Sequence, residues 1–235
     1  MVCGLTFAGA DAAERGINFN VCASSNLRGS LNISTPESPY LSVFRGASFS
    51  TVGINTMSKC VAFLRAINVG GHTVKMDYLR RLFEALGFSN VETFISSGNV
   101  IFDSTSKSTK ALERKIEYHL QETLGYEVST FIRSTSELAN IANYKPFAAS
   151  ELNAEGNALY IAFVTDVPSD ESKQKLLSFT TEDDDFHVKG REVYWLCCKK
   201  PSESEFSGAL LEKVLGMHAT LRNSTTVTRI ASKYS

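Results

Sequence analysis

Apolar and polar residues follow regular patterns from residue 60 onward. Short apolar runs bounded by glycine or by turn residues predict strands, and apolar residues spaced three and four apart predict helices. Glycines stand where two of these helices would end, at Gly87 and Gly125. The expected elements of this half are a strand at 60–69, a helix at 76–86, strands at 91–95 and 100–102, a helix at 112–124, a strand at 128–132 and a short helix that begins in a capping box at Ser134 and stops before Pro146.

Part of the same order returns after residue 157. The expected elements are a strand at 159–164, a helix introduced by Pro168-Ser169, a hairpin of strands at 186–188 and 193–198 across Lys189-Gly190-Arg191, and a helix at 210–215 closed by Gly216. Tyr194 and Trp195 alternate along the second strand of that hairpin, so we expect one in the core and the other against the partner domain. The last segment, 226–234, fits a strand or a helix, and the apolar spacing that begins at Val227 favours the helix.

The order of elements predicts the fold class. The first half has the order β-α-β-β-α-β, which is the ferredoxin-like (alpha-beta plait) unit, and the second half repeats β-α-β-β-α. We therefore expect an α+β protein of two tandem ferredoxin-like domains, at 57–148 and 157–235.

Residues 1–56 differ in composition from the rest of the chain. They contain no lysine, are rich in serine and show no sustained period, whereas Met57-Ser58-Lys59 opens a segment of different character. We expect 1–56 to be a disordered or non-native extension. It fits upstream sequence translated ahead of a natural start at Met57, an organelle transit peptide or an artefact of expression. Its acidic residues count against the transit peptide, and the first explanation is favoured.

Composition and charge narrow the classes of function. The chain has 25 acidic and 24 basic residues and a formal net charge of −1, which gives no general attraction to nucleic acid or to anionic membranes. No apolar run reaches the roughly 18 residues of a membrane helix. The five cysteines form no CxxC pair and the four histidines no HxxxH or HExxH pattern, so we expect no metal site. Reduced thiols indicate a cytoplasmic protein.

The segment from Arg65 to Met76 is the strongest candidate for chemistry. It combines a strand end, the pair Gly70-Gly71 and the start of a helix. A helix N-terminus offers unpaired N–H groups and partial positive charge, glycines let a ligand approach the backbone, and Arg65 and Lys75 add cations. The pattern is neither GxxxxGK[ST] nor GxGxxG. The same residues also fit a tight β-to-α turn that needs glycine for its backbone angles.

The predicted topology brings a second loop to this one. In a plait the exit of the first strand and the tip of the following hairpin lie at one rim of the sheet, so we expect the 68–75 loop beside the 96–99 turn. Small polar side chains and free backbone N–H groups suit a small anionic or polar ligand, although an ordinary hairpin turn also explains 96–99. The candidate ligand-binding residues at this rim are Arg65, Asn68, Gly70, Gly71, Lys75, Ser96, Ser97, Gly98 and Asn99.

A second pair of candidates, Arg222 and Asn223, precedes the last predicted helix. As a loop, this pair can hold a ligand carboxylate or phosphate. It can equally cap the helix and pin the C-terminal element to the domain interface. We favour this structural role, with Asn223 or Ser224 near the N-cap.

Several of these motifs occur together in one known family. LRAINVGG with Lys75-Met76, FISSGNVIF, Lys145-Pro146-Phe147 and the late Thr220-Leu-Arg222-Asn223 resemble the bacterial DUF1697 family, from about residue 60 to the C-terminus. The resemblance implies two tandem ferredoxin-like domains, in agreement with the pattern above, and implies no activity. The family usually places an aromatic residue after the Arg-Asn pair, where this chain has Ser224.

Three hypotheses for function follow from the sequence. The first is a site for a small anionic or polar ligand at the glycine-loop edge of the first domain, with enzymatic activity left open and no catalytic residue or cofactor assigned. The second is a protein-interaction or oligomerisation module. The third and least favoured is single-stranded nucleic-acid binding, because the strand Val100-Ile101-Phe102-Asp103 lacks the basic and aromatic run of an RNA-recognition motif.

Overall fold

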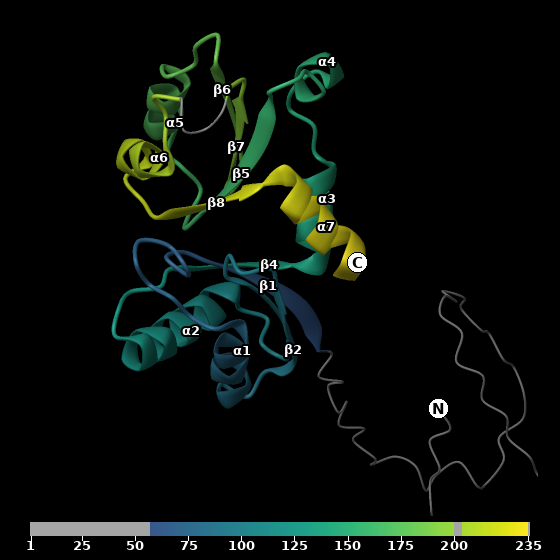
Figure 1. Cartoon of the computed structure of the whole chain (residues 1–235), viewed down its shortest axis with the longest axis vertical. Helices are drawn as coiled ribbons and strands as arrows, with labels where there is room; N and C mark the ends of the chain where they lie inside the picture. The colour runs from purple at the N-terminus through teal and green to yellow at the C-terminus, as the bar shows by residue number, and fades with distance from the viewer. Residues whose placement is uncertain (1–56, 200–203, 235) are drawn as a thin grey trace, which may run out of the picture. The chain divides into compact units, whose positions relative to one another are not determined.

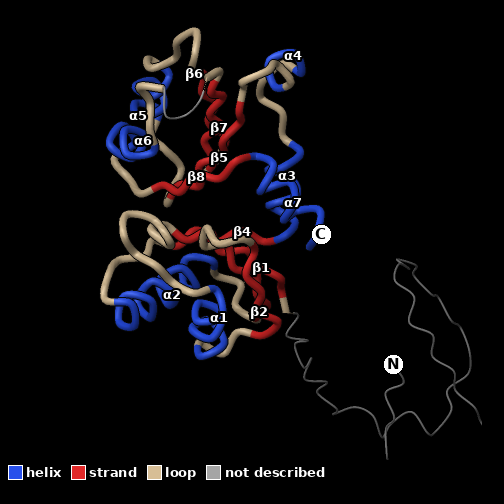
Figure 2. The backbone as a smooth tube through the Cα atoms, in the orientation of Figure 1, coloured by secondary structure: helices blue, strands red, loops and turns tan. Residues whose placement is uncertain are grey.

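The first domain is a four-stranded sheet with helices on one face. The computed structural model describes residues 57–199 and 204–234, and the prediction for 1–56 lies outside these residues. Neighbouring strands are antiparallel, in the order β2-β3-β1-β4. Figures 1 and 2 show α1 and α2 together on one side of this sheet. This is the ferredoxin-like order that the sequence predicts. The elements are β1 (Ser58–Leu64), α1 (Met76–Ala85), β2 (Ser89–Phe94), β3 (Asn99–Ser104), α2 (Thr109–Leu124), β4 (Thr130–Ser134) and α3 (Thr135–Asn143).

The second domain repeats this plan. Its strands are again antiparallel, in the order β6-β7-β5-β8, and the helix after its last strand matches α3 in the first domain. The chain is therefore an α+β protein of two tandem domains, as predicted. The short helix α4 (Ala149–Leu152) lies in the segment between the domains, and the elements of the second domain are β5 (Ala158–Val164), α5 (Asp170–Leu177), β6 (Asp184–Lys189), β7 (Glu192–Cys197), α6 (Gly208–Leu215), β8 (Ala219–Asn223) and α7 (Ser224–Tyr234).

The structure differs from the predicted elements in several places. The first strand ends at Leu64 rather than at residue 69, because Ala66 and Asn68 adopt the left-handed conformation with φ of 63° and 57°. Ile95 belongs to the hairpin turn, whereas Asn99 already lies in β3. Residues 219–223, read as a loop around the Arg-Asn pair, form the edge strand β8, and the helix after it confirms the prediction for the C-terminus.

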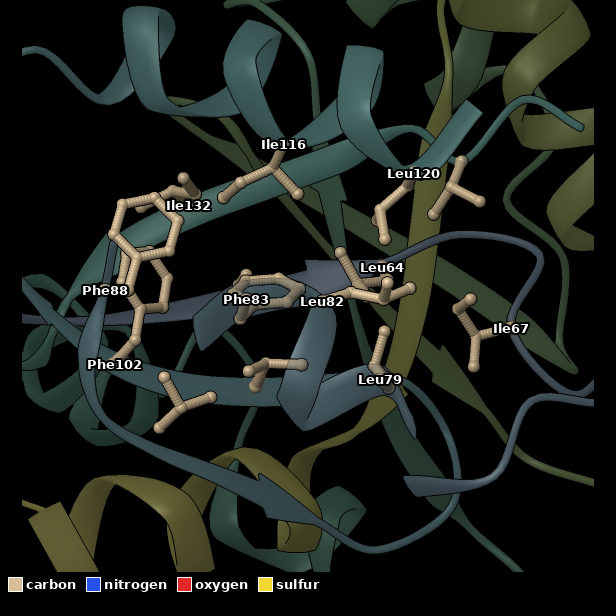
Figure 3. Close-up of a cluster of buried hydrophobic side chains, with 14 of the residues drawn as sticks. Leu64, Ile67, Leu79, Leu82, Phe83, Phe88, Phe102, Ile116, Leu120 and Ile132 are labelled. Atoms are coloured by element: carbon tan, nitrogen blue, oxygen red, sulfur yellow. The ribbon is translucent and has the colours of Figure 1, made fainter. Parts of the chain in front are cut away.

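The core of the first domain lies between its sheet and the helices α1 and α2. Leu79 and Phe83 project from one face of α1 and Ile116 from α2, and all three are buried against the sheet (Figure 3). The ends of α2 follow its sequence: Ser108 accepts a hydrogen bond from the Ala111 N–H at the start, and Gly125 is left-handed at the end.

The other faces of the two sheets bury each other. Phe63 of β1 and Phe163 of β5 stack with ring centroids 4.0 Å apart, and both belong to a core cluster shared by the two sheets, α3 and α7. These two helices pack together beside the sheets (Figure 1). Tyr194 lies in this shared cluster and Trp195 in the second domain's own core, which confirms the predicted alternation. The sheet face on which RNA-binding plaits stack bases is covered here by the other sheet.

Candidate functional site

The two loops predicted to meet at the rim of the first sheet are in contact. The Asn68 side chain donates to the Ser96 carbonyl oxygen at 2.8 Å and accepts from the Val74 N–H at 2.7 Å. A Cβ atom at Gly98 would lie 2.9 Å from Cβ of Ile67, so the turn packs closely on the loop. The predicted neighbourhood is therefore confirmed. Asn68 acts within it as a clamp between the loops.

Arg222 reaches this rim from the second domain and is buried there. Its Nε donates to Asn99 Oδ1 at 2.6 Å, and burial lowers the pKa of its guanidinium to about 10, so it remains charged at neutral pH. Its terminal nitrogens donate to acceptors from both domains, namely Thr220 Oγ1 and the carbonyl oxygens of Leu64, Ser97, Gly98 and Leu221. Arg222 therefore fastens β8 to the end of β1 and to the β2–β3 turn.

Arg65 is paired with a carboxylate of the second domain. Its Nε and Nη2 donate to the two carboxylate oxygens of Glu212 at 2.7 and 2.8 Å. Burial raises the pKa of Glu212, but the hydrogen bonds from Arg65 and from the Ala219 N–H outweigh it and hold that pKa below its usual range. The bidentate pair joins the domains through a guanidinium that the sequence analysis gave as a candidate for ligand binding.

The remaining predicted residues at the rim are more open. Gly70, Gly71 and Lys75 are exposed, and both glycines are left-handed, with φ of 62° and 87°. Lys75 is the N-cap residue of α1, and its side chain makes no capping hydrogen bond. Asn223 caps α7 by accepting from the Thr225 N–H at 2.9 Å, which confirms its structural role. Ligand binding by the rim residues stays a prediction.

Arg133 is the counterpart of Arg222 in the first domain. Arg133 of β4 stands opposite Val61 of β1, and Arg222 of β8 stands opposite Ile161 of β5. Arg133 is buried and contacts the β6–β7 hairpin as Arg222 contacts the β2–β3 hairpin. Its Nε donates to Glu192 Oε1 at 2.7 Å, Nη2 to the Arg191 carbonyl oxygen and Nη1 to the Ile132 carbonyl oxygen.

Arg133 is not among the residues that the sequence motifs pointed to. The signal that would have found it is the repeat itself: Arg133-Ser134 and Arg222-Asn223 each place an arginine directly before the N-cap residue of the helix that follows the domain's last strand. Aligning the two halves on these caps pairs the arginines.

A pocket of about 420 Å³ lies beside Arg133, between α3 and the β6–β7 hairpin. The two hairpins differ in length: residues 95–98 separate β2 from β3, whereas only Gly190 and Arg191 separate β6 from β7. We attribute the space over Arg133 to the shorter turn. The residues that line this interdomain pocket are Arg133, Glu137, Asn140, Ile141, Val167, Lys189, Gly190, Arg191, Glu192 and Tyr194.

Charged groups on the pocket wall are mostly engaged by neighbours. Glu137 completes the capping box of α3 with Ser134. Burial raises the pKa of Glu137, but these hydrogen bonds and the nearby arginines outweigh it and lower the pKa overall. Lys189 Nζ lies 3.6 Å from the centre of the Tyr144 ring, and Arg191 pairs with Glu113 at 3.5 Å. Ile141, Val167 and Tyr194 make the wall partly apolar.

The described residues contain neither a cluster of metal-ligating side chains nor a helix of membrane-spanning character. In 57–199 and 204–234, no three His, Cys, Asp or Glu side chains gather closely enough to share a metal ion. The helices of the same ranges all lack the length and apolar character that a membrane crossing requires.

Comparison with known proteins places the chain in a family. The solved structure of conserved bacterial protein SP0830 from Streptococcus pneumoniae is similar, with a TM-score of 0.61 and 24% sequence identity, over 76% of this chain and 99% of that chain. At that identity the likeness shows the fold alone. No curated protein matches. The family model described as "Protein of unknown function (DUF1697)" matches residues 57–194, more than half of the sequence, and the chain therefore belongs to the DUF1697 family.

Proposed function

We propose that this protein binds a small anionic or polar molecule and that the interdomain pocket receives it. The observation that carries the proposal is the pocket itself, which has the volume of a small-ligand site, lies at a domain interface and combines apolar walls with converging charged groups. Arg133, Lys189 and Arg191 outnumber Glu137 and Glu192 on its wall, so the balance of charge favours an anion.

The test blocks the pocket without touching its charged groups. Val167 lines the pocket and is 59% exposed, so Val167→Trp fills the mouth at little cost to the fold. Leu177→Trp is the matched control, because Leu177 of α5 is also an exposed apolar residue and does not line the pocket. Thermal unfolding is measured against a panel of small carboxylates, sugar phosphates and nucleotides.

We expect at least one compound to raise the melting temperature of the wild type and of Leu177→Trp but not of Val167→Trp. A panel without effect on the wild type, or an effect that survives in Val167→Trp, contradicts the proposal.

The glycine-loop rim is a second candidate for the same function. Ile95 at its tip is 47% exposed and has a φ of 51°, a left-handed conformation that is costly for a β-branched residue and that tends to occur at functional sites. Lys75 and the two glycines supply its open groups. If this rim is the site, Lys75→Ala weakens binding in the same screen and Val167→Trp does not. The interaction-module hypothesis is tested separately by light scattering.

A further inference from the structure

We infer that the interdomain pocket anchors a single carboxylate or phosphate group on Arg133, so that its ligand is a small organic acid or phosphate ester with an apolar body. This inference rests on the proposed function and names the chemistry of the ligand. It is carried by a comparison of the two equivalent arginines, which occupy the same place in the two domains and differ in what surrounds them.

Arg222 has acceptors for its whole guanidinium. A guanidinium has five N–H donors. Arg222 donates from Nε to Asn99, from Nη1 to Thr220 Oγ1 and to the Leu221 carbonyl oxygen, and from Nη2 to the carbonyl oxygens that converge at the rim. Its charge is therefore held by a closed shell of protein oxygens.

Arg133 lacks such a shell. Within the described residues its Nε, Nη1 and Nη2 make one hydrogen bond each, to Glu192, Ile132 and Arg191. One N–H on each terminal nitrogen is left over, although the residue is only 1% exposed. The two-residue turn of the second hairpin supplies one carbonyl acceptor, from Arg191, where the longer turn of the first supplies two.

The two spare donors belong to a residue that lines the pocket. Leaving buried donors unpaired costs free energy, and a donor on each of the two Nη atoms suits the two oxygens of a carboxylate or phosphate. Neither nearby carboxylate takes these two donors: Glu192 accepts from Arg133 at Nε, and Glu137 accepts from Ser134. An external anion is therefore the acceptor that this arrangement lacks.

The rest of the wall indicates the body of the ligand. Ile141, Val167 and Tyr194 line the same pocket, and the Tyr194 hydroxyl is turned to the Ile141 carbonyl oxygen at 3.3 Å. An apolar or aromatic group beyond the anionic head buries its surface against them. Among the described residues that line the pocket, Arg133 alone combines burial with spare donors, so we expect one anionic head.

The experiment compares two variants that make the same chemical change. Arg133→Lys keeps the charge but loses the planar guanidinium that presents donors on two nitrogens, and Arg222→Lys makes the same substitution at the fully hydrogen-bonded arginine. The probes are hexanoate and phenyl phosphate, which separate a carboxylate from a phosphate head, together with acetate, inorganic phosphate and the neutral hexanamide. Dissociation constants are measured by calorimetry at constant ionic strength, and circular dichroism checks that each variant is folded.

We expect hexanoate or phenyl phosphate to bind the wild type. The dissociation constant of that probe should rise about tenfold or more in Arg133→Lys and stay within about twofold of the wild-type value in Arg222→Lys. Acetate and inorganic phosphate, which lack the apolar body, bind more weakly than their larger counterparts. Equal losses in the two arginine variants overturn the inference, because they show a general effect of charge or packing.

The neutral probe separates this inference from the proposed function. If hexanamide binds as tightly as hexanoate and Val167→Trp abolishes the binding of both compounds, the pocket is confirmed as the binding site. The anionic anchor on Arg133 is then overturned. If no probe binds the wild type, the inference of an anionic anchor on Arg133 is overturned. The thermal-unfolding panel described under the proposed function then tests whether the pocket binds any small molecule. If Arg133→Lys does not fold, the side-chain ¹⁵Nε–¹H signal of Arg133 in the wild type replaces it, and a signal that hexanoate or phenyl phosphate leaves unmoved overturns the inference.

Discussion

Arginine 133 and arginine 222 show how strongly the neighbours of a single residue decide its role. Both are buried, both lie in the last strand of a domain and both sit over the ring of a phenylalanine, Phe163 or Phe63, at 5.4 and 5.7 Å. The β2–β3 turn supplies carbonyl acceptors to Arg222, so that this residue links the two domains through hydrogen bonds. A shorter turn leaves Arg133 with spare donors beside a pocket.

Removing the Arg222 guanidinium is expected to destabilise the fold strongly. Arg222→Met leaves Asn99 and several buried carbonyl oxygens without their donor, which costs about 3 kcal/mol or more of the free energy of unfolding. Urea unfolding measures the loss. Lys75→Met, at an exposed side chain, is the control and is expected to stay within about 0.5 kcal/mol of the wild type. A loss in Arg222→Met as small as in this control would contradict the assigned role.

The Arg65–Glu212 pair is expected to make stability depend on acid pH. The pKa of Glu212 is lowered in the folded state, so its contribution is fully present above its unfolded pKa of about 4.5 and is lost as the pH falls through the lowered value. Glu212→Gln should therefore cost about 1 kcal/mol near neutral pH and progressively less below pH 4.5, as measured by unfolding at several pH values.

Glu117 provides a control of opposite sign. It accepts from the Thr130 N–H as Glu212 accepts from the Ala219 N–H, but burial raises its pKa. The ionised form is thus disfavoured in the fold, and the contribution of Glu117 falls as the pH rises from about 4.5 through the raised value. If Glu117→Gln and Glu212→Gln show the same pH dependence, the two assignments are wrong.

At the scale of elements, the loop after β1 and the β2–β3 turn hold each other in shape. Their contact combines the Asn68 clamp with the close approach of Gly98 to Ile67. Left-handed residues concentrate here, where the chain must leave the strand and still reach the start of α1. They are Ala66, Asn68, Gly70, Gly71, Ile95 and Gly98.

Two glycine substitutions separate backbone strain from close packing. Gly98→Ala adds a Cβ atom 2.9 Å from Cβ of Ile67 in a left-handed residue, and we expect it to cost about 2–4 kcal/mol. Gly70→Ala has a similar φ, but its Cβ would meet no heavy atom of the described residues within 4 Å, so about 1 kcal/mol is expected. Chemical denaturation measures both. Equal costs would show that the turn does not pack on the loop as described.

Local signals predicted most elements of the fold but not every one. The capping box at Ser134 and the left-handed Gly125 and Gly216 lie where the sequence placed them, because caps depend on a few adjacent residues. The strand β8 was missed because its five residues form a short edge strand of mixed polarity, and pairing with β5 rather than local pattern makes it a strand.

At the scale of the whole molecule, the two domains form one structural unit. A single core cluster draws buried residues from both sheets, and Arg222 and Arg65 add hydrogen bonds between the domains. Each domain alone would expose the sheet face that the other covers. We therefore expect the domains to unfold together.

A substitution in the shared cluster tests this cooperativity. Phe163→Ala removes one ring of the stack with Phe63 and is expected to cost about 3–5 kcal/mol. The wild type and the variant should each show one unfolding transition, with coincident midpoints by tryptophan fluorescence, which reports on Trp195 in the second domain, and by circular dichroism. Tyr118→Ala, at a side chain that is 70% exposed, is the control. Two separate transitions would contradict a shared core.

The tandem plait can be predicted from the amino-acid pattern alone, because periodicity and caps are local properties of each segment. The same pattern also places the 68–75 loop beside the 96–99 turn, since the order of elements fixes which loops share a rim. The roles of the charged residues, in contrast, depend on how the folded domains pack against each other. Arg65 and Arg222 meet partners across the domain interface that lie more than a hundred positions away in the sequence, and the pocket beside Arg133 is lined by residues of both domains. Such long-range contacts depend on how the domains pack against each other, and no local sequence pattern encodes that packing.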